Sequence, residues 1–121
     1  MKRSKIIIMD NEKVIVPSEV RMNISEIADL FGIFHQTAKR HIRAIEKSGV
    51  AGGDYSMSST CQGAKVYPDY YGLEMIIALT FRVQSAEADV FRKWLLHKAI
   101  KTEVLQIPKK LLLPVQNSSL N

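Results

Sequence analysis

The alternation of hydrophobic and polar residues near the start of the chain predicts a β-hairpin. A short β-branched run covers 5–9, and a second run covers 14–16. Turn-forming polar residues at 10–13 separate the two runs, and Pro17 follows the second one. Short β-branched runs on either side of such a turn are typical of paired strands, and proline ends the second strand.

The spacing then changes to that of a helix. From about Ser25, apolar residues recur every three or four positions, with Ile27, Leu30 and Phe31 on one face. Asn23 or Ser25 provides the N-terminal cap. Gly32 ends the helix, because glycine adopts the left-handed conformation that helix C-termini commonly require.

A second helix is expected from His35 or Gln36 to about Ser48, with Gly49 directly after it. Ala38, Ile42 and Ile45 mark its apolar face. The opposite face carries polar and basic residues: Gln36, Lys39, Arg40, Arg43 and Lys47.

The remaining pattern predicts a second hairpin and two more helices. The hairpin strands are expected at 54–60 and 65–70, with the turn at 61–64. The segment 73–83 is apolar nearly all round, which predicts the most buried helix. A longer amphipathic helix is expected from Ala86 to about Leu105.

The inward face expected for the last helix comprises Val90, Phe91, Trp94, Leu95, Ala99 and Ile100. Trp94 is expected to anchor the core against Met75 or Leu79. A second basic group comprises Arg82, which suits the dipole at a helix C-terminus, and Arg92 with Lys93, which we expect to face water.

These elements predict one α+β domain over 1–107 and a tail over 108–121. The domain comprises an N-terminal β-hairpin, a helix-turn-helix with a β-hairpin wing (winged-helix-like) and two C-terminal helices. The tail contains the apolar run 111–115, which we expect to dock on this chain or on a partner.

Length and composition limit the classes of function. The chain has 121 residues and a formal net charge of +5, which suits a polyanionic partner. Its single cysteine, Cys61, forms no internal disulfide, which fits the reducing cytoplasm. No apolar run approaches the roughly 20 residues that span a bilayer, so no membrane association is expected.

The segment from Ile24 to Arg43 has the spacing of a helix-turn-helix. Ala28 is small where the helices cross, Gly32 follows four residues later at the turn, and Ile33 fills the space beneath it. The second helix then suits the major groove of double-stranded DNA. The DNA-binding residues we predict are Phe34, His35, Gln36, Thr37, Lys39, Arg40, Arg43 and Lys47.

Within this set, Gln36, Thr37 and Arg40 are expected near base edges, and Lys39, Arg43 and Lys47 near phosphates. Phe34 is unusual in such a turn. It is consistent with contact to a thymine methyl, packing on the wing, or a corner that binds protein.

Several segments in order resemble the RhuM-like virulence protein family over roughly residues 5–101. The residues that carry the resemblance are Ile6–Ile8, Ile24–Gly32, His41-Ile42, Tyr67–Val83 and Phe91–Leu95. Members are described as DNA-binding proteins of bacterial mobile regions, beside restriction-modification genes. The resemblance implies a transcriptional regulator or an accessory factor of such a locus.

The sequence shows no recognisable catalytic motif. The sequence has no Gly-x-Ser-x-Gly elbow and no phosphate-binding Gly-x-x-x-x-Gly-Lys run. His35 and His41 do not share a helix face, and no Cys-x-x-Cys occurs, so no metal and no cofactor are expected. Sequence-specific DNA binding would need a homodimer, for which 73–83 and 111–113 are candidate surfaces. The alternative is a protein-interaction module that binds a partner protein through Phe34 and the apolar tail.

Overall fold

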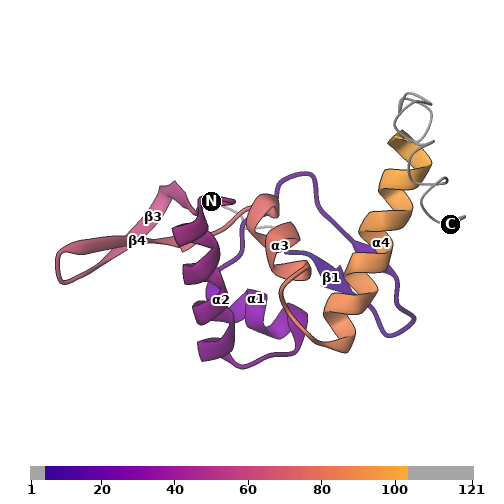
Figure 1. Ribbon diagram of the computed structural model, residues 1–121, viewed down its shortest axis with the longest axis horizontal. Coiled ribbons are helices and arrows are strands. Elements are labelled where there is room, and N and C mark those ends of the chain that lie inside the picture. The colour runs from indigo at the N-terminus through magenta and orange to yellow at the C-terminus, as the bar shows by residue number, and fades with distance from the viewer. Residues whose placement is uncertain (1–4, 104–121) are drawn as a thin grey trace, which may run out of the picture.

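The computed structural model describes residues 5–103, and the side chains of that range except those of 54–58 and 101–103. These residues form an α+β fold with four helices and two antiparallel hairpins, which confirms the predicted class (Figure 1). The elements are β1 (Ile7–Ile8), β2 (Val14–Ile15), α1 (Ile24–Phe31), α2 (His35–Ser48), β3 (Asp54–Gln62), β4 (Lys65–Tyr70), α3 (Leu73–Thr80) and α4 (Ala86–Glu103). The predicted tail and the domain boundary at 107 lie outside the described residues.

The N-terminal hairpin is confirmed, with strands shorter than the apolar runs. β1 and β2 pair with Ile7 opposite Ile15 and Ile8 opposite Val14. Ile6 and Val14 are buried, so one side of this small sheet joins the core.

The second hairpin projects from the helical body (Figure 1). Its turn contains two residues, Gly63 and Ala64, instead of the four predicted, because β3 continues to Gln62 and pairs there with Lys65. Gly63 has φ +63°, and short hairpin turns commonly place glycine at such a position. A register shift between Asp54 and Ser59 makes β3 longer than β4.

Helix α3 ends three residues before the predicted position. The backbone N–H of Arg82 donates to the carbonyl of Leu79 (2.9 Å), which closes a turn after Thr80. The guanidinium of Arg92 on α4 donates to the carbonyls of Thr80 (3.0 Å) and Val83 (3.3 Å). Arg92 therefore satisfies backbone groups at the end of α3, and the prediction that it faces water is wrong.

Helix α4 is amphipathic only in its first half. Ser85 accepts a hydrogen bond from the N–H of Ala88 (3.1 Å) and so caps its start. Phe91 is fully buried, whereas Ala99 and Ile100 are exposed, contrary to prediction. The reason is visible in Figure 1, where the second half of α4 extends away from the other helices.

The core lies between α1, α2, α3 and the first half of α4. Its largest fully buried side chains include Tyr71, Phe31, Phe91 and Met22. Trp94 is only partly buried and stacks on Phe91, with ring centroids 5.6 Å apart. Phe91, not Trp94, therefore anchors α4 in the core.

The segment 73–83 is deeply buried along one side only. Met75, Ile76 and Leu79 are inaccessible to solvent, but Leu73 and Phe81 are exposed. Among residues 5–103, no helix combines the length and the apolar character needed to cross a membrane.

Candidate nucleic-acid interface

The corner between α1 and α2 is set by residues close together in the chain. Asn23 caps α1 by accepting from the N–H of Glu26 (2.8 Å), and the Glu26 carboxylate accepts from the N–H of Asn23 (2.9 Å). Gly32 ends the helix in the left-handed region at φ +63°. A Cβ at Gly32 would lie 2.6 Å from a carboxylate oxygen of Glu87 on α4. The dihedral angle therefore favours glycine, and a side chain at this position would also displace the Glu87 carboxylate.

Helix α2 divides into a buried and a solvent-facing side as predicted. Ala38, Ile42 and Ile45 are buried on α1 and the core. On the other side, His35, Gln36, Arg40 and Lys47 are exposed, and Thr37, Lys39 and Arg43 are half-buried. Phe34, directly before the helix, is 83% exposed. The predicted residues thus lie along one helix and its preceding turn.

The β3–β4 hairpin is held beside α2 by contacts at its base. Tyr71 pairs with Met22, with backbone hydrogen bonds of 2.8 and 3.0 Å, and so joins the end of the hairpin to the start of α1. Gly53 packs against Pro68 so closely that any Cβ would overlap the proline ring. The hairpin therefore has a defined position relative to the two-helix corner.

Arg43 connects α2 directly to this hairpin base. Its guanidinium donates to the hydroxyl of the buried Tyr71 (2.9 Å) and lies over the ring of Tyr67, 4.1 Å from the centroid. It also pairs with Glu46 at 3.0 Å. Burial acts to lower the pKa of Arg43, but the interactions with Tyr71 and Glu46 outweigh it and raise the pKa, so the side chain stays charged. Arg43 thus fixes the hairpin, a role that the sequence does not predict.

A groove of about 840 Å³ runs between α2 and the hairpin. Its lining carries four cations and one carboxylate, Glu46, which pairs with Arg43. The cations are Lys39, Arg43 and Lys47 from α2 and Lys65 from β4. Lys65 belongs to this lining, and the sequence does not predict it there. Lys65 pairs with Gln62 across the hairpin, and the position of the hairpin beside α2 places Lys65 in the groove.

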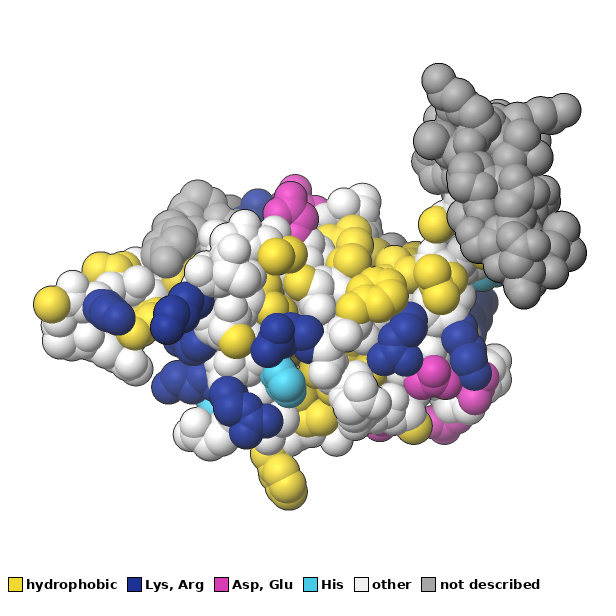
Figure 2. Space-filling view, in the orientation of Figure 1, with side chains coloured by type: hydrophobic (Ala, Val, Ile, Leu, Met, Phe, Trp, Pro, Cys, Tyr) yellow, Lys and Arg dark blue, Asp and Glu magenta, His cyan; other side chains and the backbone are white. Residues whose placement is uncertain are grey.

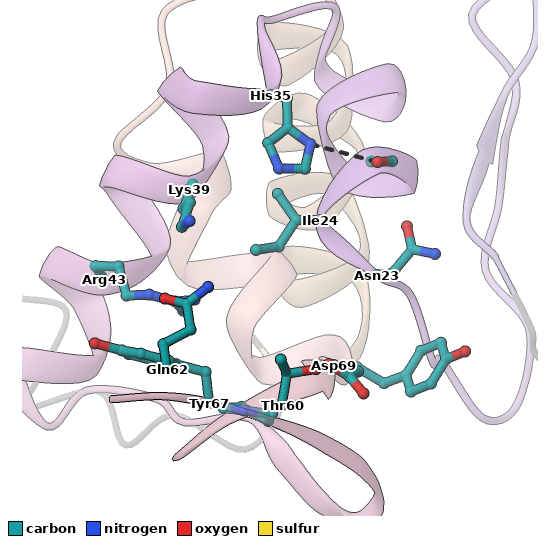
Figure 3. Close-up of a pocket in the computed structure, with 12 residues that line it drawn as sticks. Asn23, Ile24, His35, Lys39, Arg43, Thr60, Gln62, Tyr67 and Asp69 are labelled. Atoms are coloured by element: carbon teal, nitrogen blue, oxygen red, sulfur yellow. Dashed lines mark hydrogen bonds between the residues drawn. The ribbon is translucent and has the colours of Figure 1, made fainter. Parts of the chain in front are cut away.

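A smaller pocket of about 400 Å³ shares Lys39, Arg43, Gln62 and Tyr67 with the lining of this groove (Figure 3). Its walls are the starts of α1 and α2 and the inner side of the hairpin. Here the His35 ring nitrogen Nδ1 lies 3.3 Å from the hydroxyl of Ser25, and Thr60 donates to Asp69 (2.6 Å). Lys39 and Arg43 therefore line both hollows between α2 and the hairpin.

Arg82, which the sequence places in a second basic group with Arg92 and Lys93, lies outside the DNA-binding set that we predict. It lies in the turn after α3, which packs on α2, and its charge acts on His41. Burial lowers the pKa of His41, and the charges of Arg40 and Arg82 lower it further. Figure 2 shows Lys and Arg side chains spread over the hairpin and α2.

Comparisons of the chain with protein-family models, with curated proteins and with solved structures found no match. The resemblance to the RhuM-like family therefore stays a prediction.

Proposed function

We propose that this protein binds double-stranded DNA, with α1 and α2 acting as a helix-turn-helix and the β3–β4 hairpin as its wing. The observation that carries the proposal is the solvent-facing side of α2. The helix carries four cations and one carboxylate, and that carboxylate is already paired with Arg43. A helix of 14 residues is about 21 Å long, and the major groove, about 12 Å wide, accepts a helix.

The proposed contacts differ along α2. Gln36, Thr37 and Arg40 lie toward base edges, with Phe34 and His35 beside them at the start of the helix. Lys39 and Lys47 bind phosphates, and Lys65 adds a backbone contact from the wing. Arg43 was predicted as a phosphate contact, and we propose that it acts chiefly by holding the wing beside α2.

We further propose that the protein works in the cytoplasm as a transcriptional regulator or as an accessory factor of a mobile element or restriction-modification locus. This role follows from the RhuM-like resemblance and agrees with a basic surface that recognises duplex DNA. One domain neutralises few phosphates, so its affinity should depend strongly on salt.

Specific recognition would then use two copies on half-sites about one helical turn apart. Most of α3 is unavailable for such a dimer, since Met75, Ile76 and Leu79 are inaccessible. The exposed Leu73 and Phe81 are the apolar groups that α3 offers. We expect light scattering of the DNA complex to give the mass of two chains, and a mass of one chain would contradict the dimer.

The test of DNA binding is titration of a labelled duplex at about 50 and 200 mM salt. Lys39→Ala and Lys47→Ala should each weaken binding about tenfold and reduce the slope of log K against log salt by about 0.9. Lys13→Ala removes the same charge from the turn of the N-terminal hairpin and should change neither value. Equal slopes for the wild type and both α2 variants, or no binding at low salt, would refute the proposal.

The alternative function is a protein-interaction module, and the 83% exposure of Phe34 is the observation that favours it. Under this alternative, Phe34→Ala abolishes capture of a partner protein, whereas Lys39→Ala leaves it unchanged. If Phe34 instead contacts a thymine methyl, Phe34→Ala weakens binding to duplexes with that thymine and leaves the salt slope unaltered.

A further inference from the structure

The pocket of about 400 Å³ between the two-helix corner and the hairpin has walls from three parts of the chain. The start of α1 contributes Ile24 and Ser25, α2 contributes His35 and Lys39, and the hairpin contributes Thr60. Figure 3 shows Ile24, Lys39 and Thr60 around one open space. Ligand sites in proteins commonly have volumes of about 300–1,000 Å³, so this pocket has the size of a site for a small molecule.

The α2 wall of the pocket carries a positive charge without an acidic partner. Lys39 is half-buried, and no described side chain forms an ion pair with it. His35 lies one turn before Lys39 on the same face of α2. Its Nδ1 lies 3.3 Å from the hydroxyl of Ser25, so this contact fixes the orientation of the ring beside Lys39. An ammonium group and a hydrogen-bonding imidazole at this spacing suit a phosphate group.

The hairpin wall of the pocket has different chemistry. Thr60 donates to Asp69 (2.6 Å), which provides the carboxylate of this lining. A carboxylate accepts several hydrogen bonds, so Asp69 can also accept from an amino or hydroxyl group of a ligand. Ile24, Tyr67 and Pro68 add apolar surface. The pocket thus has a positive end on α2, with acceptors and apolar groups on the hairpin and the start of α1.

We propose that this pocket binds a nucleotide, with its phosphate at Lys39 and His35 and its base against the hairpin. A nucleotide carries negative charge at one end and a flat ring with polar edges at the other, and the two walls complement these groups in that order. The guanidinium of Arg43 lies 4.1 Å from the centre of the Tyr67 ring, so the hairpin presents an aromatic group in a fixed position. Aromatic side chains bind bases of any identity by stacking.

A nucleotide in this pocket would oppose the binding of duplex DNA. Lys39 and Arg43 line both the pocket and the neighbouring groove, so a phosphate bound to Lys39 removes this cation from the phosphates of a duplex. The competition rests on the proposed DNA-binding function, whereas the nucleotide site does not. The nucleotide has two sources, a free mononucleotide that acts as an effector or an unpaired nucleotide of a DNA strand.

The first experiment measures the binding of AMP, GMP, CMP and UMP to the full chain by calorimetry, without DNA. We expect saturable binding of at least one of the four. The corresponding nucleoside lacks the phosphate and ribose 5-phosphate lacks the base, so each should bind about tenfold more weakly than the mononucleotide. Equal binding of ribose 5-phosphate and the mononucleotide would show that the base is not bound and would overturn the nucleotide site.

Two variants alter the pocket at residues that do not line the groove. Ser25→Ala removes the hydroxyl that contacts His35, and Thr60→Val removes a hydroxyl on the hairpin wall. Each should weaken mononucleotide binding about fivefold and leave duplex affinity within about twofold of the wild type. Lys47→Ala is the matched control, because Lys47 lines the groove and not the pocket, and should leave mononucleotide binding unchanged. Wild-type mononucleotide binding by both pocket variants would overturn the site.

The last experiment separates the two sources and tests the competition. A saturating mononucleotide should weaken duplex binding by the wild type about tenfold and should have no effect on Lys39→Ala. A duplex with one unpaired 5′ nucleotide should bind more tightly than a blunt duplex only if the nucleotide belongs to a strand. Mononucleotide binding by a protein that binds no duplex would support the site and refute the proposed function. Duplex binding without a response to any mononucleotide or to the unpaired nucleotide would overturn the site alone.

Discussion

Helices α2 and α4 each carry four lysine or arginine residues, but the side chains on the two helices differ in their interaction partners. On α4, Arg92 bonds to carbonyls at the end of α3, Lys93 pairs with Asp89, and Lys98 lies 5.6 Å from the centre of the Trp94 ring. On α2, Arg43 alone of the four has an ion pair within the described residues. Figure 2 shows the contrast, since acidic side chains lie next to the basic ones on the α4 side.

The difference follows from where the acids stand in each helix. α4 has Glu87 and Asp89 in its first turn, and Asp89 lies three and four residues before Arg92 and Lys93, the spacing at which helical side chains meet. α2 has no acid in its first turn, and its only acid, Glu46, comes late and pairs with Arg43. The two helices therefore have equal numbers of cations but differ in how many of those cations have acidic partners.

The largest effect expected is from Arg92→Ala, which tests whether the α4 cations are structural. The variant leaves the carbonyls of Thr80 and Val83 without their charged donor, so the free energy of unfolding should fall by about 2 kcal/mol. Chemical denaturation measures it.

The matched variant on α2 is Arg40→Ala, which removes an exposed arginine and should change the free energy of unfolding by less than about 0.5 kcal/mol. Its duplex affinity should fall instead. If the two variants destabilised the protein equally, the contrast between the helices would not hold.

The two-helix corner was predictable because its signals are local. The Asn23 cap, the glycine at 32, the apolar face of α2 and the glycine at 49 all act within one or two turns of the residues they affect. Of the two caps considered for α1, the structure selects Asn23, with Glu26 completing a capping box. The α+β class and both hairpins were predicted on the same kind of evidence.

What the sequence did not predict depends on contacts between distant segments. The exposure of Ile100 is determined by how far α4 extends beyond the core, and periodicity does not report that. Arg43 meets Tyr71 only because the hairpin folds back on α2. The pKa of His41 is lowered first by burial and then by the charges of Arg40 and Arg82, and the burial depends on how the distant segments pack. The basic surface was thus predictable along α2, and its extension to Lys65 was not.

The second prediction concerns a substitution at the corner that sets the orientation of α2. Gly32→Ala places a side chain at φ +63° and against Glu87, and should lower the free energy of unfolding by about 1–2 kcal/mol. Gly63→Ala has the same φ with nothing within 4 Å, so the difference between the two isolates the Glu87 contact. Denaturation curves measure both, and wild-type stability for Gly32→Ala would mean that the corner tolerates a side chain.

The third prediction concerns the one cation of α2 that resembles those of α4. Arg43→Lys keeps the charge but loses the planar stack on Tyr67 and the hydrogen bond to Tyr71, and should cost about 1 kcal/mol of stability. If Arg43 acts by holding the wing, duplex affinity falls about threefold with an unchanged salt slope. A slope reduced by about 0.9 would instead identify Arg43 as a phosphate contact.

The smallest effect expected is the pH dependence of stability that comes from His41. Burial, Arg40 and Arg82 lower the pKa of His41 below the 6.5 of an unfolded chain. The unfolded state therefore binds more protons, so the contribution is fully present above pH 6.5 and is lost as the pH falls toward the folded pKa. Denaturation at steps from about pH 7.5 to 5.5 measures it, and His41→Gln should remove part of the slope. An identical slope in the wild type and His41→Gln would show that the folded protein does not lower the pKa of His41.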